Sequence, residues 1–442
     1  YYGALAKEET DGVMVSPISF CPVTEEFIGR GGNFENPYMV AKNLPLPYGI
    51  GEEIDGYETV AAMRFADAVI SPGETKTYII ALGYGNSEEE IDKLGEKYLD
   101  TKAFDSFLEE TKKYWQDKIN VSYNSADSDF DNWMHWVNFQ PMLGCSFLPH
   151  HDYGKGGRGW RDLWQDCLAL LIMEPKQVRQ MLIDNFGGVR FDGTNATIIG
   201  SKQGEFIADR NNIVRVWMDH GAWPYLTTSL YMQQTGDIEF LNEENTYFKD
   251  AQIGRGEHRD NLWSDGEGNM QLSEDDTPYR GTVLEHLLIQ HLTSFYDVGE
   301  HNHIRLRGAD WNDGLDMAEK RGESVAFTAL YGGNLRDLAK DIMTLSKKTG
   351  KDTISLAKEI EVLLNADKTV YDSIDEKHKV LNAYCNAVGH KVSGEKVSVD
   401  CTKLCNVLNE MSSWIADHIR KTEWITNKEG NSWFNGYYDN SG

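Results

Sequence analysis

The chain has 442 residues, of which 40% are hydrophobic, so it can bury large cores and two globular units are expected. Its 70 Asp and Glu residues outnumber its 43 Lys and Arg residues, and the formal charge of −27 argues against nucleic acid and acidic membrane surfaces as partners. The 12 Trp and 21 Tyr residues suit either ordinary core packing or contact with the CH faces of sugars.

Residues 11 to 84 are expected to form β-strands. The runs "DGVMVSPISF", "YETVAAMRFADAVI" and "TKTYIIALGYG" are rich in strand-forming residues, and the turn "SPGE" separates the last two. This pattern predicts a β-sandwich, or part of one, within residues 1–86.

From residue 87 the period of the apolar residues becomes helical, which predicts two helices leading away from the sheet. The first covers "NSEEEIDKLGEKYL" and the second covers "FDSFLEETKKYWQDKI". The polar segment "SYNSADSD", residues 122–129, is rich in turn-formers. We therefore place the domain boundary near this segment and assign residues 87–128 to a helical linker.

Helices dominate residues 129–442, which are predicted to form one helical domain. Pro175 suits the first turn of a helix, whereas Gly236 and Gly350 suit helix ends. Long loops between helices in a compact domain are usually functional, so paired helices arranged as a toroid around a loop-built site fit the pattern. The predicted helices are "NWMHWVNFQPML", "WQDCLALLIM", "PKQVRQMLIDNF", "AWPYLTTSLYMQQTG", "GTVLEHLLIQHLTSFYDV", "NLRDLAKDIMTLSKKTG", "ISLAKEIEVLLNA" and "LCNVLNEMSSWIADHIRK".

The six cysteines are scattered, and no spacing typical of a metal site accompanies them. We expect free thiols in a reducing, cytoplasmic compartment, and neither a metal nor an organic cofactor. The sequence contains no apolar run of membrane length and no signal peptide, and it begins with Tyr. It is therefore expected to be part of a longer protein.

The segment "HHDYGKGGRGWRDLWQD", residues 150–166, forms a positive island in an acidic chain. Its cations include two His residues, Lys155, Arg158 and Arg161, which is what a small anion would need. If a helix begins near Arg161, this residue and Asp166 lie on one side of its start and can address neighbouring hydroxyl groups. A capped helix entry with solvated charges is the alternative interpretation.

The second distinctive segment is "RGADWNDGLD", residues 307–316. Its two glycines allow a sharp bend that presents Asp310, Trp311 and Asp313 in quick succession. An acid for glycosyl transfer must stay protonated near neutral pH, and an aromatic wall with a neighbouring carboxylate raises its pKa. Asp313 beside Trp311 meets these conditions. The alternative is an Asx-type turn whose aspartates cap the following helix.

The pair of motifs "GRGWRDLWQD" and "GADWNDGLD" resembles glycoside hydrolase family 94, which includes cellobiose and chitobiose phosphorylases. The runs "FIGRGGNFENP" and "ISPGETKTYIIALGYGNSEEEI" resemble the end of that family's amino-terminal β-sandwich, and "WFNGYYDNSG" resembles a late segment of its helical barrel. The resemblance implies an α+β multidomain fold. It consists of a β-sandwich portion, a helical linker and an (α/α)6 barrel that is incomplete at its carboxy-terminal end.

The resemblance also implies roles for individual residues. Asp313, the last Asp of "DWND", matches the family's general acid, and Trp311 lines the site. Arg161 and Asp166 match residues that hold the non-reducing-end glucosyl unit, and Arg158 is a further candidate ligand. The family's phosphate site also uses a His and a Thr-Gly segment that come after the region present in this sequence.

One departure from the family concerns its "SDD" pattern before a tryptophan, which is replaced here by "MDHGAWP", residues 218–224. Asp219, His220 and Trp223 are therefore predicted to face the acceptor and to alter the disaccharide specificity. Asp310 completes the set of predicted substrate-binding residues. The run "RGADWNDGLDMAEKRGES" is most similar to the 1,2-β-oligoglucan phosphorylases of the family.

The implied reaction is inverting phosphorolysis of a β-linked gluco-oligosaccharide to α-glucose 1-phosphate and a shortened saccharide. Asp313 would protonate the departing oxygen while inorganic phosphate attacks from the opposite face, in place of the activated water of an inverting hydrolase. Two alternatives stay open: an inverting β-glucoside hydrolase with Asp316 or Glu285 as its base, and a non-catalytic saccharide-binding protein. No nucleic acid or membrane partner is expected, and a homodimer is one open assembly.

Overall fold

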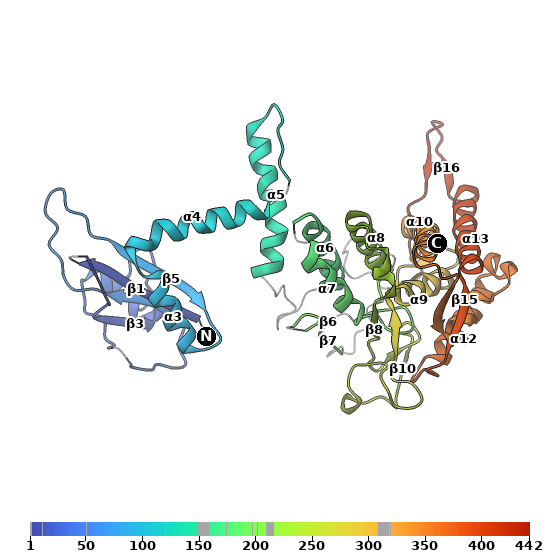
Figure 1. Ribbon diagram of the computed structural model, residues 1–442, viewed down its shortest axis with the longest axis horizontal. Helices are drawn as coiled ribbons and strands as arrows, with labels where there is room; N and C mark the ends of the chain where they lie inside the picture. Colours follow the sequence, from blue (N-terminus) through green and yellow to red (C-terminus); the bar gives the residue numbers. More distant parts are fainter. Residues whose placement is uncertain are drawn as a thin grey trace. The chain divides into compact units, whose positions relative to one another are not determined.

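The computed structural model describes residues 2–10, 12–49, 51–119, 121–147, 159–173, 175–196, 198–200, 202–208, 216–307, 318 and 320–442. The chain forms two compact units, Tyr1–Lys118 and Ile119–Gly442 (Figure 1). The domain boundary predicted near residues 122–129 lies shortly after this division.

The first unit contains two small antiparallel sheets. In one sheet, β1 (Tyr2–Thr10) lies between β2 (Val13–Val15) and β5 (Tyr78–Tyr84). In the other, β3 (Ser19–Val23) pairs with β4 (Thr59–Arg64). Strands β2, β3, β4 and β5 fall within the predicted strand region, residues 11–84. Two short helices, α1 (Thr24–Ile28) and α2 (Tyr38–Ala41), lie between β3 and β4 in the sequence.

Two helices follow β5, as the change of period predicts. Helix α3 spans Glu88–Tyr98, and its N-cap Ser87 accepts a hydrogen bond from the backbone N–H of Glu90. Helix α4 spans Thr101–Lys118 and contains no fully buried residue. It ends where the first unit ends.

The second unit begins with helices joined by loops of very different length. Helices α6 (Trp160–Met173) and α7 (Pro175–Phe186) follow α5 (Ser128–Phe147), and both α7 and α8 (Trp223–Thr235) pack against α6. Pro175 begins α7, as predicted. Gly236 ends α8 with φ of 73°, a left-handed conformation that suits glycine, and this prediction is also confirmed.

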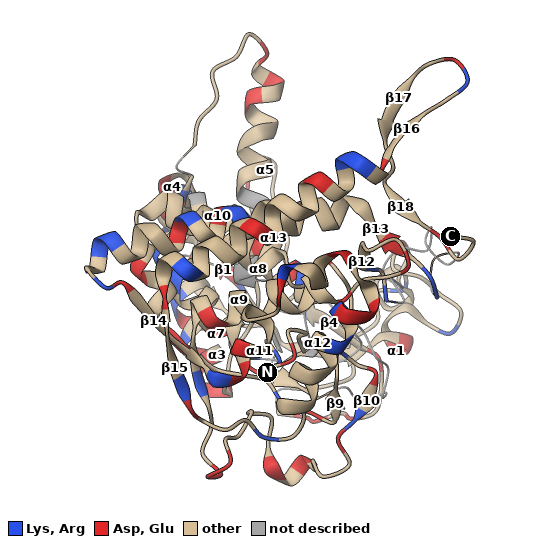
Figure 2. Ribbon diagram, turned by 90° about the vertical axis from the view of Figure 1, so that its right-hand side faces the viewer, with Lys and Arg blue, Asp and Glu red and all other residues tan. Residues whose placement is uncertain are grey.

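The core of the second unit is built around α9 (Val283–Tyr296), every residue of which is buried. Helix α10 (Val325–Thr349) contacts α9 and packs extensively against α13 (Cys401–Thr422), while α12 (Ile374–Ala387) contacts α9 as well. Acidic and basic residues are interspersed along α13 (Figure 2). A wholly buried helix with amphipathic neighbours is the arrangement of an inner helix covered by outer ones.

The prediction of one helix over "ISLAKEIEVLLNA" is wrong. Residues Thr353–Ala357 form strand β14, and only Glu361–Leu364 form an α-helix, α11. Strand β14 pairs with β15 (Lys396–Asp400), so that Ile354 faces Val399. Pairing with a strand distant in the sequence outweighs the local helical pattern, as is common for short apolar runs.

A small three-stranded sheet contains the two strands that flank the second distinctive segment in the sequence. Strand β12 (Ile304–Arg305) pairs with β13 (Glu323–Ser324), which also pairs with β18 (Tyr437–Tyr438). The preceding hairpin of β16 (Trp424–Thr426) and β17 (Ser432–Phe434) extends away from the helices (Figure 2). The β12–β13 pairing brings the two ends of residues 306–322 together.

Over the described ranges, no helix is both long enough and apolar enough to cross a bilayer. The cysteines whose side chains are described are buried, and none of them forms a disulfide with another; they are Cys21, Cys167, Cys385, Cys401 and Cys405.

Candidate active site

Two of the predicted sugar ligands lie on α6. Arg161 is in the first turn of this helix and Asp166 is in the second, and both are partly buried. The buried Trp160 fixes the start of the helix, because its indole Nε1 donates a hydrogen bond to the carbonyl oxygen of His220 at 2.9 Å. Arg158 and the rest of residues 148–158 lie outside the described residues.

The carboxylate of Asp219 joins two other predicted site residues. Arg161 Nε donates to Asp219 Oδ2 at 2.5 Å, and Trp223 Nε1 donates to the same oxygen at 3.0 Å. The Asp219 side chain is 2% exposed and that of Arg161 is 22% exposed, so a buried carboxylate supports a partly accessible guanidinium. Residues from two separately predicted motifs, Arg161 on α6 and Asp219 and Trp223 just before and at the start of α8, thus form one contact group.

The Asp219 carboxyl group is held in its ionised form. Burial by itself would raise its pKa, but the charges of His220 and Arg161 and the hydrogen bond from Arg161 outweigh burial, so the pKa lies below its ordinary value. An ionised carboxylate makes a strong, charge-assisted hydrogen bond to a guanidinium. The contacts therefore assign Asp219 the task of orienting Arg161 and Trp223, in addition to any contact with the acceptor.

Two residues that the sequence analysis missed support the loop around Asp219. Trp217 places its ring 4.7 Å from that of His220 and 5.7 Å from the guanidinium carbon of Arg161. Asn195 Nδ2 lies 3.3 Å from His220 Nδ1. The run of aromatic and charged residues around "VWMDH" is a signal that could have identified Trp217. Asn195 carries no such signal, because it comes from a long loop that precedes this run.

A buried apolar cluster connects the loop around Asp219 with both flanks of the "DWND" segment. Met218 lies next to Asp219, whereas Leu306 and Ala318 lie before and after residues 308–317. The members of the cluster are Met218, Ala222, Ile304, Leu306, Ala318 and Tyr331, with Phe327 and Leu330 packed against them. The flanks of two motifs that are far apart in the sequence therefore meet in one core.

In this cluster the Tyr331 side chain lies close to the backbone of the loop around Asp219. The Tyr331 hydroxyl donates to the carbonyl oxygen of Met218 at 2.7 Å. A Cβ atom at Gly221 would lie 2.6 Å from the Tyr331 hydroxyl oxygen, so only glycine fits at that position of "MDHGAWP".

The predicted catalytic and binding residues Asp310, Trp311 and Asp313 lie outside the described residues, as does Asp316.

Glu285, the second base candidate of the hydrolase alternative, lies in the core and is 0% exposed. Its Oε1 accepts a hydrogen bond from Tyr247 Oη at 2.9 Å, while Oε2 accepts from the backbone N–H of Ala357 at 2.7 Å and from Tyr279 Oη at 3.3 Å. A carboxyl group enclosed in this way cannot activate a water molecule beside a sugar. The assignment of Glu285 as a base is therefore wrong.

Burial instead gives Glu285 an influence on stability. Burial raises its pKa from 4.5 to about 7, so the folded protein keeps a proton that the unfolded chain has already lost between these pH values. The parent protein therefore loses about 3 kcal/mol of stability through this group as the pH rises across that interval. We expect Glu285→Gln, which resembles the protonated form, to lack this loss. Urea unfolding of both proteins at pH 4.5 and pH 8 measures the difference, and a pH-independent difference would contradict the prediction.

Comparison with protein families identifies both units. The profile described as "Glycosyl hydrolase 94, supersandwich domain" matches residues 6–101, and the profile described as "Glycosyl hydrolase 94 superfamily, catalytic domain" matches residues 114–261. The second match includes Arg161, Asp219 and Trp223 and ends before Asp313. Together the matches define a glycosyl hydrolase-type protein in which a supersandwich domain precedes a catalytic domain. The chain belongs to glycoside hydrolase family 94, which confirms the resemblance found in its motifs.

Curated relatives are distant but cover much of this chain. The cyclic β-(1,2)-glucan synthase NdvB of Rhizobium meliloti is 25% identical over 318 residues, 70% of this chain and 10% of that protein. The solabiose phosphorylase of Paenibacillus borealis is 24% identical over 362 residues, 80% of this chain and 40% of that protein. The N,N'-diacetylchitobiose phosphorylase of Vibrio furnissii is 24% identical over 284 residues, 59% of this chain and 32% of that protein. The chain thus spans 10% to 40% of the length of these relatives.

Proposed function

We propose that the protein catalyses inverting phosphorolysis of β-linked gluco-oligosaccharides, releasing α-glucose 1-phosphate and a shortened saccharide. The observation that carries this proposal is the apolar cluster that packs the neighbours of Asp219 against both flanks of the "DWND" segment. Asp219 binds Arg161 and Trp223, which supports a single site for the proposed sugar ligands and the proposed acid. Phosphorylases among the relatives support the reaction class.

In this proposal Asp313 is the general acid and Trp311 is the apolar wall beside it. Arg161 and Asp166 bind hydroxyl groups of the glucosyl unit, and Asp219 fixes the plane of the Arg161 guanidinium by accepting its Nε–H. The acid protonates the glycosidic oxygen as its bond to the anomeric carbon breaks, while a phosphate oxygen bonds to that carbon from the opposite face. Phosphate replaces the activated water, so no catalytic base is needed.

The phosphate site is proposed to begin in the positive segment at residues 150–161. In a chain with a formal charge of −27, an anion is repelled at long range, and a local clamp of Arg and His residues is needed to bind it. Arg158 belongs to this proposed clamp. Asp310 and Trp223 complete the proposed contacts with the saccharide, and the buried Asp219 supports them through Arg161 and Trp223.

The substrate is proposed to be a β-1,2-linked gluco-oligosaccharide. The similarity of "RGADWNDGLDMAEKRGES" to 1,2-β-oligoglucan phosphorylases supports this choice, and so does the presence of a cyclic β-(1,2)-glucan synthase among the relatives. The helices are proposed to belong to an (α/α)6 barrel. The wholly buried α9, with α10 and α12 in contact with it, supports an inner and an outer layer of helices.

We expect the protein to be inert towards β-1,2-linked gluco-oligosaccharides without phosphate and to release glucose 1-phosphate once inorganic phosphate is added. The reverse reaction should proceed with α-glucose 1-phosphate and a glucosyl acceptor. Free glucose and glucose 1-phosphate are measured side by side. Steady glucose release in phosphate-free buffer would identify a hydrolase, and saccharide binding without either product would identify a binding protein.

A further inference from the structure

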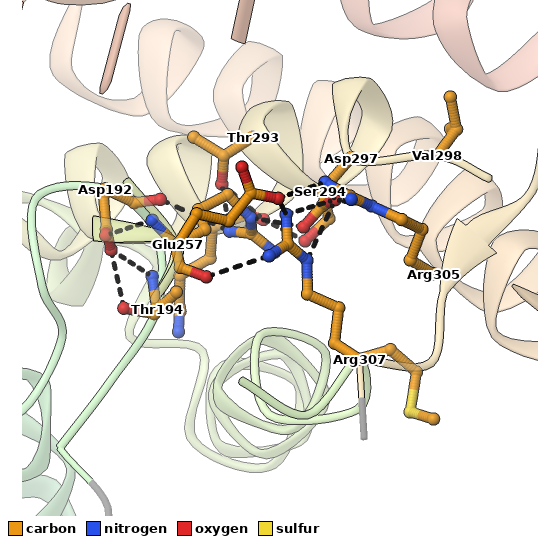
Figure 3. Close-up of polar contacts among 12 residues, drawn as sticks. Asp192, Thr194, Glu257, Thr293, Ser294, Asp297, Val298, Arg305 and Arg307 are labelled. Carbon is orange, nitrogen blue, oxygen red and sulfur yellow. Dashed lines mark hydrogen bonds and ion pairs between the residues drawn. The ribbon is translucent and has the colours of Figure 1, made fainter. Parts of the chain in front are cut away.

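Three arginine side chains converge on one buried carboxylate just before the "DWND" segment (Figure 3). The carboxylate belongs to Asp297, which directly follows α9 and is 1% exposed. Its Oδ1 accepts hydrogen bonds from Arg305 Nε at 2.6 Å and from Arg307 Nη2 at 2.9 Å. Its Oδ2 accepts one from Arg255 Nε at 2.7 Å. Asp297 thus connects the end of a core helix, strand β12 and a loop that is distant in the sequence.

Arg307 is held by more than this carboxylate. Its Nη2 lies 2.9 Å from Glu257 Oε1, and its Nη1 donates to the carbonyl oxygen of Arg255 at 3.1 Å. Glu257 also pairs with Arg305 at 3.1 Å. The guanidinium of Arg307 is therefore fixed by several acceptors at once, which restricts its backbone as well.

Arg255 is also held by several hydrogen bonds. Its backbone N–H donates to Asp192 Oδ2 at 2.7 Å, and its Nη1 donates to Thr293 Oγ1 at 3.0 Å on α9. The three guanidinium groups thus contact the carboxylates of Glu257 and Asp297, and the carboxylate of Asp192 accepts the backbone N–H of Arg255 beside them. Because these charges balance, the cluster is suited to fixing the chain and not to attracting an anion.

The backbone at two of these arginines adopts a conformation that requires support. Arg255 has φ of 54° and Arg307 has φ of 49°, in the left-handed region that residues other than glycine rarely adopt. The arginine charges also hold the pKa of Asp297 well below its ordinary value, although burial acts in the opposite direction. The carboxylate therefore stays ionised and keeps its three partners.

Successive side chains just before residues 308–317 contact two different partners. Arg305 and Arg307 bind Asp297, whereas Leu306 between them packs into the apolar cluster. Arg307 is the last described residue before residues 308–317, and only six positions separate it from Asp313. The direction in which the chain enters that segment is thus set by an ion-pair network on one side and by apolar packing on the other.

We propose that Asp297 is a positioning residue for the reaction, which fixes the entry of the chain into the segment that carries Asp313 by holding Arg305 and Arg307. The inference rests on the proposed role of Asp313 as the general acid. Small displacements of a catalytic group remote from the mutated residue can lower turnover about a hundredfold. Neutralising Asp297 should therefore act on kcat, since it displaces the acid and leaves Arg161 and its partners in place.

The first test compares two substrates in the Asp297→Asn variant. We expect kcat for a natural saccharide with phosphate to fall about tenfold to hundredfold, with KM nearly unchanged. With 2,4-dinitrophenyl β-glucoside the loss should be much smaller, because this leaving group departs without protonation. Arg307→Lys keeps the charge but loses the planar fork, and it should show the same pattern more weakly. An equal loss on both substrates would overturn the inference.

A matched control is available in the Arg190–Asp250 pair. Asp250 is buried and accepts from Arg190 Nε at 3.0 Å and from Nη2 at 2.5 Å, but it binds neither Arg305 nor Arg307. Asp250→Asn removes a buried charge in the same way, so its melting temperature should also fall. Its ratio of kcat values on the two substrates should stay that of the parent protein. A ratio changed as in Asp297→Asn would assign the effect to general loss of stability and overturn the inference.

The second test does not depend on activity. Hydrogen exchange of the backbone amides in residues 308–317 should be faster in Asp297→Asn than in the parent, and unchanged in Asp250→Asn. Unchanged exchange in Asp297→Asn would overturn the inference even if turnover fell. An inactive parent protein would overturn the proposed function instead, and the exchange comparison would still decide whether Asp297 anchors this segment.

Discussion

Asp313→Asn is expected to lower turnover of a natural saccharide with phosphate by about two to four orders of magnitude, with little change in melting temperature. The reason is that an amide cannot protonate the departing glycosidic oxygen. The measurement is kcat for glucose 1-phosphate release, together with thermal unfolding of the same sample. An activated aryl glucoside should recover most of the loss, because its leaving group departs without an acid.

Asp316→Asn provides the comparison for this variant within the same segment. If Asp313 is the acid of a phosphorylase, Asp316→Asn should retain most of the phosphate-dependent turnover. If Asp316 were the base of a hydrolase, its replacement would abolish glucose release. Near-normal turnover of Asp313→Asn with an unactivated saccharide would exclude Asp313 as the acid.

Asp219→Asn is expected to lower kcat/KM by about a hundredfold. Hydrogen bonds to charged groups contribute about 1.5–3 kcal/mol, and this carboxylate accepts from Arg161 at 2.5 Å and from Trp223 at 3.0 Å. An amide in its place loses the charge that orients the guanidinium, so saccharide binding should weaken. Saccharide affinity by calorimetry and kcat/KM for phosphorolysis measure the effect.

Asp237→Asn is a control with the same pattern of contacts, at a carboxylate that is 26% exposed. Asp237 Oδ2 accepts from Arg179 Nε at 2.9 Å and from Tyr231 Oη at 3.0 Å, so one oxygen again joins an arginine to an aromatic side chain. These residues belong to no predicted motif, and the variant should bind saccharide as the parent does. If both variants lose affinity equally, the Asp219 contact is structural and does not support a sugar ligand.

Much of the helical architecture could be predicted because its signals are local. Apolar residues at helical spacing, Pro175 at a helix start and Gly236 at a helix end act within one or two turns of the chain. Strand β14 could not be predicted in this way, because its state depends on β15, which follows about forty residues later. Helix α12 was also missed, since its few buried residues give a weak pattern.

For the site, residue types could be predicted more readily than their contacts. Arg161 and Asp219 were chosen from separate motifs, and no sequence pattern indicates that their side chains meet. Asp297 carries still less signal, because an Asp that follows a helix is ordinarily a solvated turn residue. Glu285 was wrongly predicted as a base because its position in the sequence does not reveal its burial. A Glu in a first helical turn is usually exposed, but here the whole helix is buried.

The pairing of β12 with β13 has a consequence for how long the segment between them can be. It joins the ends of residues 306–322, so that the fold depends on where this segment starts and finishes and only weakly on its length. Closing a loop twice as long costs about 0.6 kcal/mol more, which most domains tolerate. Insertions between the two strands should therefore leave the helices that support the segment unchanged.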